Sequence, residues 1–325
     1  MLMVVAAGNA GQHNRARTLG SPAVAKNVLA VGASQSYGDG TPSSGGKRGI
    51  DFLANFSSRG PTPDGRIAPH VVGPREGSAS AFLSECGSGS SEGVAYESGT
   101  SAATAAISGA AALVRQYFKD GFHLTGERNA ASSHDPTASL VKAVMINGAR
   151  EVLGVDNGAY VTPSYYYDGA QGFGRVSLAH SLPLRGHNWI NALVVDRTDL
   201  RDGEMLTYEF VVNKDNACPE TEVRATLVWA DPPASAGCVR CLVNDLDLVV
   251  LNGRTGRMDY PNGLGGKDDT NNVERVIALA ANGDTFTVTV HAANLDRERQ
   301  AFSLIITGCI TFENDIAFFG GEEEA

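Results

Sequence analysis

The chain has 325 residues, and at roughly 150 residues per domain this length suggests about two domains. Its net charge of −10 at pH 7 argues against a nucleic-acid-binding protein, because such proteins usually present a basic face. No apolar run reaches the ~18–20 residues of a membrane-spanning helix, so we expect no membrane span in this chain.

Residues 1–187 have the pattern of an α/β domain. Short apolar segments that end in glycine are typical of strands buried on both faces, and we predict two of them, at Val4–Ala7 and Val28–Val31. Helical spacing and small residues predict helices over Ala102–Phe118 and Thr137–Ala149. We therefore expect a mostly parallel sheet flanked by helices. The apolar start of the chain lacks the basic residues of a signal peptide, so we also expect the chain to begin inside a domain.

Residues 188–325 change to a period-2 pattern. Apolar residues alternate with others over 223–229 and 286–291, and 301–307 is predicted as a further strand. Asn-Gly and Asp-Gly turns separate such runs. The second part is therefore predicted to be an antiparallel β-sandwich, of a jelly-roll-like kind.

The cysteines are too few for a disulfide scaffold, and their odd number leaves at least one unpaired within the chain. The Cys-x-x-Cys spacing can be half of a zinc site, but no second Cys or His pair has finger or ribbon spacing. A structural role, free or in a disulfide, is the favoured interpretation. The five are Cys86, Cys218, Cys238, Cys241 and Cys309.

Glu97–Ser101 opens the Ala-rich helix with a serine. At a helix start a serine is most often an N-cap, and spacing alone favours that interpretation. The same position also suits a nucleophile, because the helix dipole and free backbone N–H groups stabilise developing negative charge. The G-x-S-x-G elbow of α/β-hydrolases fits poorly, since Ala103 stands where the second glycine belongs.

Asn9 follows the first predicted strand directly after a glycine. Gly-Asn can be a plain turn. It can also present an amide donor at the carboxyl edge of the sheet, where α/β proteins place ligands. A side-chain amide of this kind is a good donor to an oxyanion.

Four blocks in this order resemble the subtilisin-like serine proteases. They correspond in that family to the oxyanion-hole strand, the segment after it, the stretch ahead of the nucleophile and the nucleophile motif. The blocks are Val4–Gly11, Leu19–Ala33, Phe56–Arg66 and Ser98–Thr104.

The resemblance extends over nearly the whole chain. Ala138–Ala149 and Gly172–Ser177 are similar to the end of the catalytic domain. Three further segments resemble the β-sandwich fused after that domain in some larger subtilases, which include oxidatively stable alkaline bacterial proteases. These segments are Leu227–Pro233, Leu242–Leu248 and Asn271–Arg275.

The resemblance implies a serine endopeptidase that forms an acyl-enzyme on Ser101. The side-chain amide of Asn9 and the backbone N–H of Ser101 would donate to the oxyanion. It also implies a polypeptide substrate, no cofactor for catalysis, and a secreted or secretory-pathway protein. The implied substrate-binding residues are Ala6, Ala7, Gly8, Gly99 and Thr100.

The sequence departs from the family pattern in its acid and base. In the family the catalytic Asp and His both precede the oxyanion Asn. Neither the Asp-Ser-Gly or Asp-Thr-Gly motif of that Asp nor the His-Gly-Thr motif of that His occurs in this sequence. Ala102 and Ala105 replace a Met and a Pro of the motif, and His70 stands where an Asp is usual. Because Ser101 without a general base is an ordinary alcohol, we expect no peptide hydrolysis by this chain alone. A non-catalytic, degenerate or fragmentary module that binds protein or glycan remains the alternative.

Asp245 and Asp247 are predicted to share one face of a strand, since residues i and i+2 point the same way. With neighbouring oxygen ligands they can form a structural calcium site. The alternative is a solvated acidic face that protects a sheet edge. The neighbours are Asn244, Asp268, Asp269 and Glu274. The sequence is silent on oligomeric state and cleavage preference.

Overall fold

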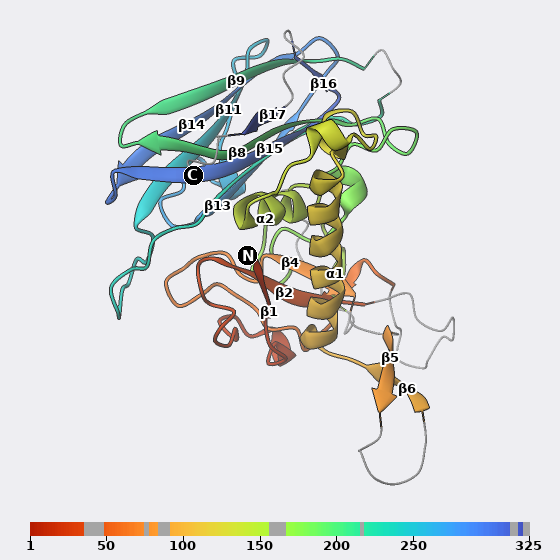
Figure 1. Ribbon diagram of the computed structural model, residues 1–325. Coiled ribbons are helices and arrows are strands. Elements are labelled where there is room, and N and C mark those ends of the chain that lie inside the picture. Colours follow the sequence, from red (N-terminus) through yellow and green to blue (C-terminus); the bar gives the residue numbers. More distant parts are fainter. Residues whose placement is uncertain are drawn as a thin grey trace.

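The computed structural model describes residues 1–35, 49–74, 78–83, 92–155, 167–214, 218–312 and 318–320. Figure 1 shows an α/β part below and a stack of long strands above, with one short helix lying between them. A long helix stands along the side of the molecule. The two parts predicted from the sequence are thus both present.

Three parallel strands form the centre of the α/β part. β1 (Met3–Ala6) and β4 (Val71–Pro74) each pair with β2 (Val28–Ser34) in parallel. Every residue of β2 is buried, as in a strand covered on both faces. The two predicted strands are confirmed as β1 and β2, but burial on both faces holds for β2 alone, because β1 is exposed at Met3 and half-buried over Val4–Ala6. On its other side β1 has no strand partner among the described residues.

Short strands complete this part. β3 (Phe52–Leu53) pairs with the end of β2, and β7 (Gly154–Val155) pairs with β3. β5 (Ser78–Leu83) and β6 (Glu92–Glu97) form a separate antiparallel hairpin. The sheet is therefore mixed, with a parallel centre.

The long helix α1 (Thr100–Lys119) crosses the strands on one face of the sheet (Figure 1). A Cβ built at Gly73 of β4 would lie 2.7 Å from Ile107, so glycine there permits the close approach. The second helix, α2 (Ala138–Asn147), starts after Thr137, which caps it by accepting a hydrogen bond from Leu140 N at 3.0 Å. None of the described helices combines the length and apolar composition needed to cross a membrane. The short 3₁₀ helices are η1 (Gln12–Asn14), η2 (Phe122–Leu124), η3 (Ala130–Ser132), η4 (Leu178–His180) and η5 (Pro261–Gly263).

The second part consists of two five-stranded sheets, ordered β13-β10-β15-β8-β17 and β12-β11-β14-β9-β16. Inward side chains from both sheets form one core. All pairings are antiparallel except that of β17 with β8, which is parallel and departs from the prediction. The strands are β8 (Asn191–Arg201), β9 (Met205–Val212), β10 (Glu222–Trp229), β11 (Asn244–Asn252), β12 (Met258–Asp259), β13 (Val273–Leu279), β14 (Thr285–Leu295), β15 (Arg299–Gly308), β16 (Ile310–Thr311) and β17 (Phe318–Gly320).

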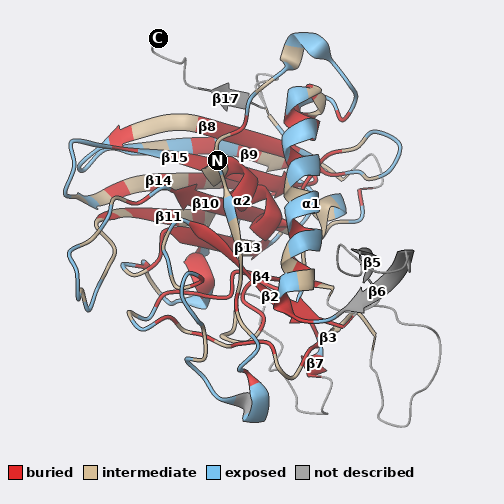
Figure 2. Ribbon diagram, turned by 60° about the horizontal axis from the view of Figure 1, so that its bottom comes forward, coloured by how far each residue is buried: buried red, intermediate tan, exposed pale blue. Residues whose placement is uncertain are grey.

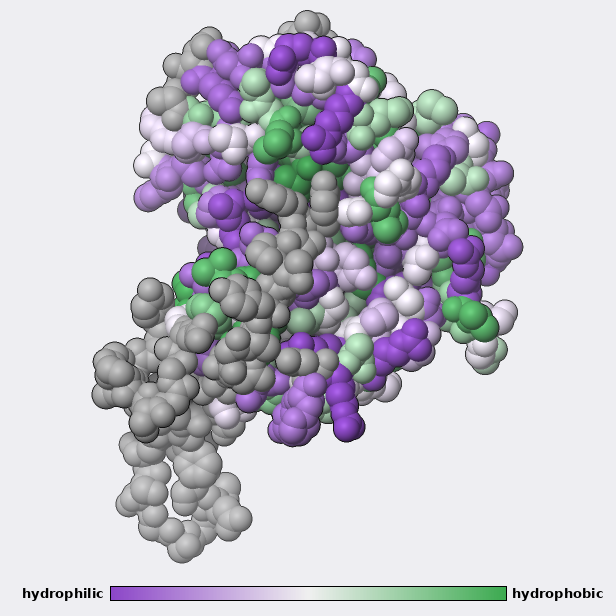
Figure 3. Space-filling view, turned by 180° about the vertical axis from the view of Figure 1, so that it is seen from behind, coloured by the Kyte–Doolittle hydropathy of each residue, from purple (hydrophilic) through white to green (hydrophobic). Residues whose placement is uncertain are grey.

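The three strands predicted in this part are confirmed within β10, β14 and β15. The jelly-roll-like connectivity stays a prediction. Seen from behind, hydrophilic residues and small apolar areas are interspersed over the surface (Figure 3). We refer to β8–β17 together as the sandwich.

Helix α2 joins the two parts. Its residues 140–147 are all buried, and Figure 2 shows it in red between the sheets. One hydrophobic core contains Val141 and Val144 of α2 together with Val228 and Ile305 of the sandwich. The boundary predicted at 187/188 thus falls just before the first sandwich strand, but a core crosses it.

Buried polar contacts hold both ends of α2 against the sandwich. At its start, Asp196 of β8 accepts hydrogen bonds from Thr137 N at 3.0 Å and Thr137 Oγ1 at 2.5 Å. At its end, Arg275 of β13 donates to the carbonyls of Ile146 at 3.2 Å and Ala149 at 3.4 Å. Such cationic donors complement the free carbonyls of a helix C-terminus.

Two disulfides lie in the sandwich, Cys218–Cys309 and Cys238–Cys241. The structural role favoured for the Cys-x-x-Cys pair is confirmed. A zinc half-site is ruled out in this state, because the oxidised sulfurs carry no thiolate. Cys86 lies outside the described residues.

Candidate active site

Asn9 stands in a loop after β1 that the segment 56–58 holds in place. Ser58 N donates to Gly8 O at 2.9 Å, and Ser58 Oγ accepts from Ala10 N at 3.1 Å. Gly8 has a φ of 107°, and a Cβ there would lie 2.9 Å from Ser58 Oγ. Glycine is therefore required at position 8 for the backbone to turn and present Asn9 at the surface.

The side chain of Asn9 is oriented by Thr100. Its Oδ1 accepts hydrogen bonds from the backbone N and the hydroxyl of Thr100, both at 3.0 Å. The Thr100 hydroxyl itself accepts from Gly8 N at 3.2 Å. A backbone N–H can only donate, so the atom facing it must be the oxygen of the amide. The other amide atom, Nδ2, therefore points away from Thr100.

Nδ2 of Asn9 lies beside the start of α1. A Cβ at Gly99 would stand 3.4 Å from it, and Gly99 has a φ of 128° that other residues rarely adopt. Nδ2 makes no hydrogen bond with any residue that the structure describes. Its two N–H donors are therefore available to a ligand at this helix terminus.

Ser101 is the second residue of α1 and is exposed. The N-cap is Gly99, which has no side chain, and Ser101 lies inside the helix, so the interpretation of Ser101 as an N-cap is wrong. The Ser101 hydroxyl makes no hydrogen bond within the described part of the chain. Its backbone N–H belongs to the first turn, where amides lack partners inside the helix and the dipole is positive.

The residues predicted along the substrate differ in exposure. Ala7 is fully buried and its N–H donates to Val31 O at 2.8 Å. Gly99 and Thr100 are also buried, whereas Ala6 and Gly8 are half-buried. Thr100 thus positions Asn9, and of the predicted substrate-binding residues Ala6 and Gly8 are partly accessible whereas Ala7 is not.

No histidine is placed to activate Ser101. All seven lie in described ranges, and none forms a hydrogen bond with its hydroxyl. His70 is 3% exposed, and its Nδ1 accepts from Ala30 N at 3.0 Å. Burial, with the charges of Lys142 and Arg66, lowers the pKa of His70 well below its usual value. It is therefore a neutral core residue that replaces the family's Asp.

The sequence did not predict that Thr100 and Ser58 position Asn9 and its loop. Ser58 contacts a residue 48 positions earlier, and Thr100 contacts Asn9 across 91 positions. Local spacing carries no signal for such contacts. Both residues lie inside blocks that carry the family resemblance, which is the one pointer the sequence offered.

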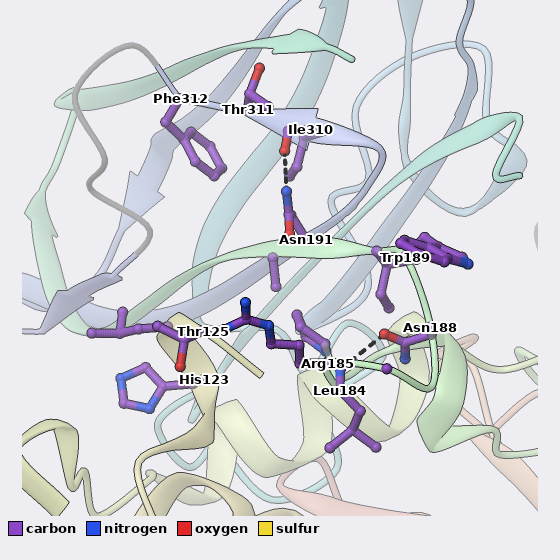
Figure 4. A pocket seen from close by; sticks show the side chains of 15 residues that line it. His123, Thr125, Leu184, Arg185, Asn188, Trp189, Asn191, Ile310, Thr311 and Phe312 are labelled. Atoms are coloured by element: carbon purple, nitrogen blue, oxygen red, sulfur yellow. Dashed lines mark hydrogen bonds between the residues drawn. The ribbon is translucent and has the colours of Figure 1, made fainter. Parts of the chain in front are cut away.

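A cavity of about 590 Å³ lies far from this site (Figure 4). It is lined by His123, Trp189, Asn191 and Phe312, among others. His123 follows the C-terminal end of α1, and a helix of 20 residues is roughly 30 Å long at 1.5 Å per residue. The cavity therefore takes no part in chemistry at Ser101.

Asp245 and Asp247 both lie in β11. Burial raises the pKa of Asp245 to about 7, and Asp247, Asp269 and Asp268 add to the effect. Burial also raises the pKa of Glu274 well above its usual value, with Asp268 as the next cause. Among the described residues no group of three or more His, Cys, Asp or Glu could hold a metal ion. The predicted calcium site stays a prediction.

An exposed serine therefore lies at the N-terminus of α1, and a side-chain amide oriented by Thr100 lies beside the same helix end. The model of the subtilase family, Peptidase_S8, matches residues 1–174. This match covers more than half of the chain, and the chain therefore belongs to the subtilase family of serine peptidases.

The chain matches less than a third of the length of its curated relatives tagB and AprX. It is 32% identical over 310 residues to the Serine protease/ABC transporter B family protein tagB of Dictyostelium discoideum, covering 79% of this chain and 16% of that protein. Serine protease AprX of Bacillus subtilis is 35% identical over 127 residues, covering 37% of this chain and 27% of that protein. Among solved structures, Sphericase matches with 23% identity and a TM-score of 0.34, covering 54% of this chain and 47% of that chain.

Proposed function

We propose that this chain carries the nucleophile and oxyanion-binding half of a serine endopeptidase site. Ser101 Oγ attacks the carbonyl carbon of a peptide bond, and an acyl-enzyme ester forms as the amine leaves. Asn9 Nδ2 and the backbone N–H of Ser101 donate to the oxyanion. The observation that carries the proposal is the pair of Thr100 hydrogen bonds to Asn9 Oδ1, which leaves Nδ2 without a hydrogen bond among the described residues and next to Gly99 at the start of α1.

The substrate in this proposal is a polypeptide. Family membership supports this class, and Ala6 and Gly8, which precede Asn9 along the chain, are only half-buried. Acyl transfer at a serine needs no cofactor. Loss of one oxyanion donor typically lowers kcat by about 10²–10³, so Asn9→Ala is expected to do so in an active form of the protein.

The hydroxyl proton of Ser101 needs an acceptor that the described residues do not supply. We therefore propose that the chain alone does not hydrolyse peptides. The test is digestion of casein by the purified 325-residue chain. Cleavage that disappears in Ser101→Ala would overturn this part of the proposal.

Competence of the site is tested with a fluorophosphonate probe, which forms a phosphonyl ester with an activated serine and releases fluoride. The probe is applied to the longest polypeptide that the gene encodes in frame with Ser101, and labelling is mapped by mass spectrometry. We expect label on Ser101, none in Ser101→Ala, and unchanged label on Ser101 in Ser98→Ala, which removes a neighbouring exposed serine. A folded protein of that length that resists the probe contradicts the proposal.

The second candidate is a non-catalytic module that binds a protein or glycan. The cavity beside Trp189 favours it, since this side chain is 61% exposed and aromatic surfaces are common in binding sites. Labelling discriminates the two candidates, because a degenerate site leaves Ser101 unreactive in every form of the protein.

We also propose a secreted or secretory-pathway location. Two disulfides within one sandwich support an oxidising compartment, because such bonds are rare in the cytosol. Family membership is consistent with it. Free-thiol counting on protein taken from cells tests this, and four reduced cysteines in the sandwich would contradict it.

A further inference from the structure

The cavity beside Trp189 lies where the two parts of the molecule meet. Its volume of about 590 Å³ is within the range of roughly 300–1,000 Å³ that ligand pockets have. Its lining comes from the segment after α1, the segment that leads into β8, and β16 with Phe312 (Figure 4). Ligand sites are common at such junctions between domains. The position and size of the cavity are therefore those of a binding site.

Most polar side chains of this lining are already hydrogen-bonded within the protein. Asn188 Oδ1 accepts from Leu184 N at 2.9 Å. Its Nδ2 donates to Ala179 O at 3.0 Å and Leu182 O at 2.8 Å, so the whole amide is used. Three further side chains donate to carbonyl oxygens, Asn191 Nδ2 to Ile310 at 2.9 Å, Thr311 Oγ1 to Val211 at 3.3 Å and Thr125 Oγ1 to Glu127 at 3.4 Å.

This lining therefore suits an apolar group better than a sugar. Burying the hydroxyls of a glycan is unfavourable unless each finds a hydrogen-bond partner, and few partners are left here. Apolar surface is plentiful, because Leu184 and Phe312 are half-buried and Trp189 is 61% exposed. Covering such surface with an apolar side chain is favourable, and tryptophan is a frequent anchor of binding sites.

The lining is cationic although the chain as a whole carries a net charge of −10. It contains no Asp or Glu among the described residues, and Arg185 is its one charged side chain. Burial, with the charge of His134 as the next cause, lowers the pKa of His123 to about 4, so this imidazole is neutral at pH 7. Arg185 pairs with Glu127 at 3.0 Å, but both side chains are more than half exposed. Such a pair is worth about 0–1 kcal/mol, so the guanidinium can exchange Glu127 for an acidic ligand.

We propose that the cavity is an exosite for the polypeptide substrate, and that it binds an aromatic or aliphatic side chain followed by an acidic one. The apolar side chain enters beside Trp189 while the peptide backbone stays in water at the rim. The acidic side chain pairs with Arg185. The proposal rests on the proposed function, since that function supplies an extended polypeptide as the occupant.

The distance from Ser101 sets the spacing of such a substrate. The two sites are separated by roughly the 30 Å length of α1, which about nine residues of extended chain span at 3.3 Å per residue. A substrate occupies both sites when its apolar and acidic pair lies about nine or more residues from the scissile bond. Binding at the exosite then raises the effective concentration of that bond at Ser101.

The two tryptophans of the chain make the proposal measurable, because Trp229 is 1% exposed and Trp189 is 61% exposed. Quenching of fluorescence by acrylamide therefore reports mainly on Trp189. The probes are Gly/Ser peptides without tryptophan that carry Phe-Glu, Ala-Glu or Phe-Gln, titrated into the 325-residue chain. We expect the Phe-Glu peptide to protect Trp189 from quenching. The Ala-Glu peptide should have an at least tenfold higher Kd, because the buried aromatic ring is lost.

Variants studied by calorimetry assign the binding to the cavity. Trp189→Ala should raise Kd for the Phe-Glu peptide at least tenfold. The matched control is Met205→Ala, which removes an apolar side chain of β9 that is 60% exposed and outside the lining, and should leave Kd unchanged. Arg185→Gln should bring Kd for the Phe-Glu peptide up to that of the Phe-Gln peptide. Glu127→Gln should lower it severalfold, because the competing carboxylate is gone.

Three results overturn the proposal. They are no protection of Trp189 at about 10 mM Phe-Glu peptide, above the mM effective concentrations of linked sites, equal Kd for the Phe-Glu and Ala-Glu peptides, and protection by a chito-oligosaccharide but not by the peptides. None of these depends on catalysis, so a protein whose Ser101 takes the fluorophosphonate label without binding the peptides would lose the exosite and keep the proposed function. Peptide binding in a protein that resists the label would support the ligand assigned to the cavity and contradict the proposed function alone.

Discussion

Asp196 is the residue through which the sandwich most directly stabilises α2. It is fully buried in β8, and its carboxylate accepts from Thr137 N, Thr137 Oγ1, Ser303 Oγ and His134 Nε2, at distances between 2.5 and 3.0 Å. Thr137 in turn caps α2. We predict that Asp196→Ala destabilises the α/β part and the sandwich together.

The expected loss of stability in Asp196→Ala follows from the hydrogen-bond donors that lose their acceptor. Removing one member of a buried, hydrogen-bonded charged group typically costs about 3–5 kcal/mol. The unfolding entropy of about 2.1 cal/mol/K per residue gives roughly 0.7 kcal/mol/K for 325 residues. The expected fall in Tm is therefore about 4–7 °C, if the molecule unfolds as one unit.

The assay is thermal unfolding followed by far-UV and near-UV circular dichroism, with hydrogen exchange at Leu140 N as a local probe of the cap. The matched control is Asp199→Ala on the same strand. Asp199 forms an exposed ion pair with Arg299 at 2.8 Å, and such pairs are worth about 0–1 kcal/mol. The control should shift Tm by about 1.5 °C or less.

Two results would refute this reasoning. The first is equal loss of stability in Asp196→Ala and Asp199→Ala. The second is a pair of separate unfolding transitions of which only the sandwich transition moves. Either would mean that α2 does not depend on the strand packed against it.

Three further predictions concern other parts of the structure. The pKa of Asp196 is lowered: burial alone would raise it, but hydrogen bonds from His134, Thr137 and Ser303 outweigh burial. Its stabilisation is therefore complete above its unfolded pKa of about 3.9 and lost as pH falls through the folded value, so parent and Asp196→Asn should converge in stability in acid denaturation between about pH 5 and pH 2. Thr100→Val removes the hydroxyl that donates to Asn9 Oδ1 and accepts from Gly8 N, while the backbone hydrogen bond to Asn9 stays; it should cost about 1–3 kcal/mol in urea unfolding and shift the NMR signals of the Asn9 side-chain amide. Thr104→Val, one turn along α1, should cost under about 1 kcal/mol, and equal costs would contradict the role given to Thr100. Replacing Cys218 and Cys309 by Ala should lower the free energy of unfolding by about 4–5 kcal/mol, because this disulfide joins residues 91 positions apart. Replacing Cys238 and Cys241, which are 3 positions apart, should lower it by only about 1.5–2 kcal/mol. The opposite order in calorimetry would refute the loop-entropy argument.

The sequence predicted the regular elements that depend on local pattern. The apolar segments at β1 and β2 and the small residues of α1 were sufficient, because a buried parallel strand and a close-packed helix each require such composition. Ser101 and Asn9 were also identified, but only the family blocks favoured them over a cap and a turn. For Ser101, spacing alone favoured a helix cap over a nucleophile.

Long-range contacts explain what the sequence did not predict. The orientation of Asn9 depends on Thr100, which is 91 positions away, and the loop that carries Asn9 depends on Ser58. Neither hydrogen bond produces a periodic pattern in the sequence from which it could be predicted. The burial of Ala7 likewise follows from its place beside Val31, so its predicted contact with substrate depended on tertiary structure.

Helix α2 shows why the two parts must be considered together. A surface helix keeps one polar face, whereas a helix buried on all sides is covered by protein throughout. Residues 140–147 are buried even at Lys142 and Asn147. Asn147 Nδ2 donates to Thr307 Oγ1 at 2.7 Å and Thr226 Oγ1 donates to its Oδ1 at 2.9 Å, so both its polar atoms are satisfied by the sandwich. Without the sandwich these atoms and the apolar side chains of α2 would face water. The sandwich is therefore part of the core on which the sheet, α1 and the position of Ser101 depend, whether or not it also binds a ligand.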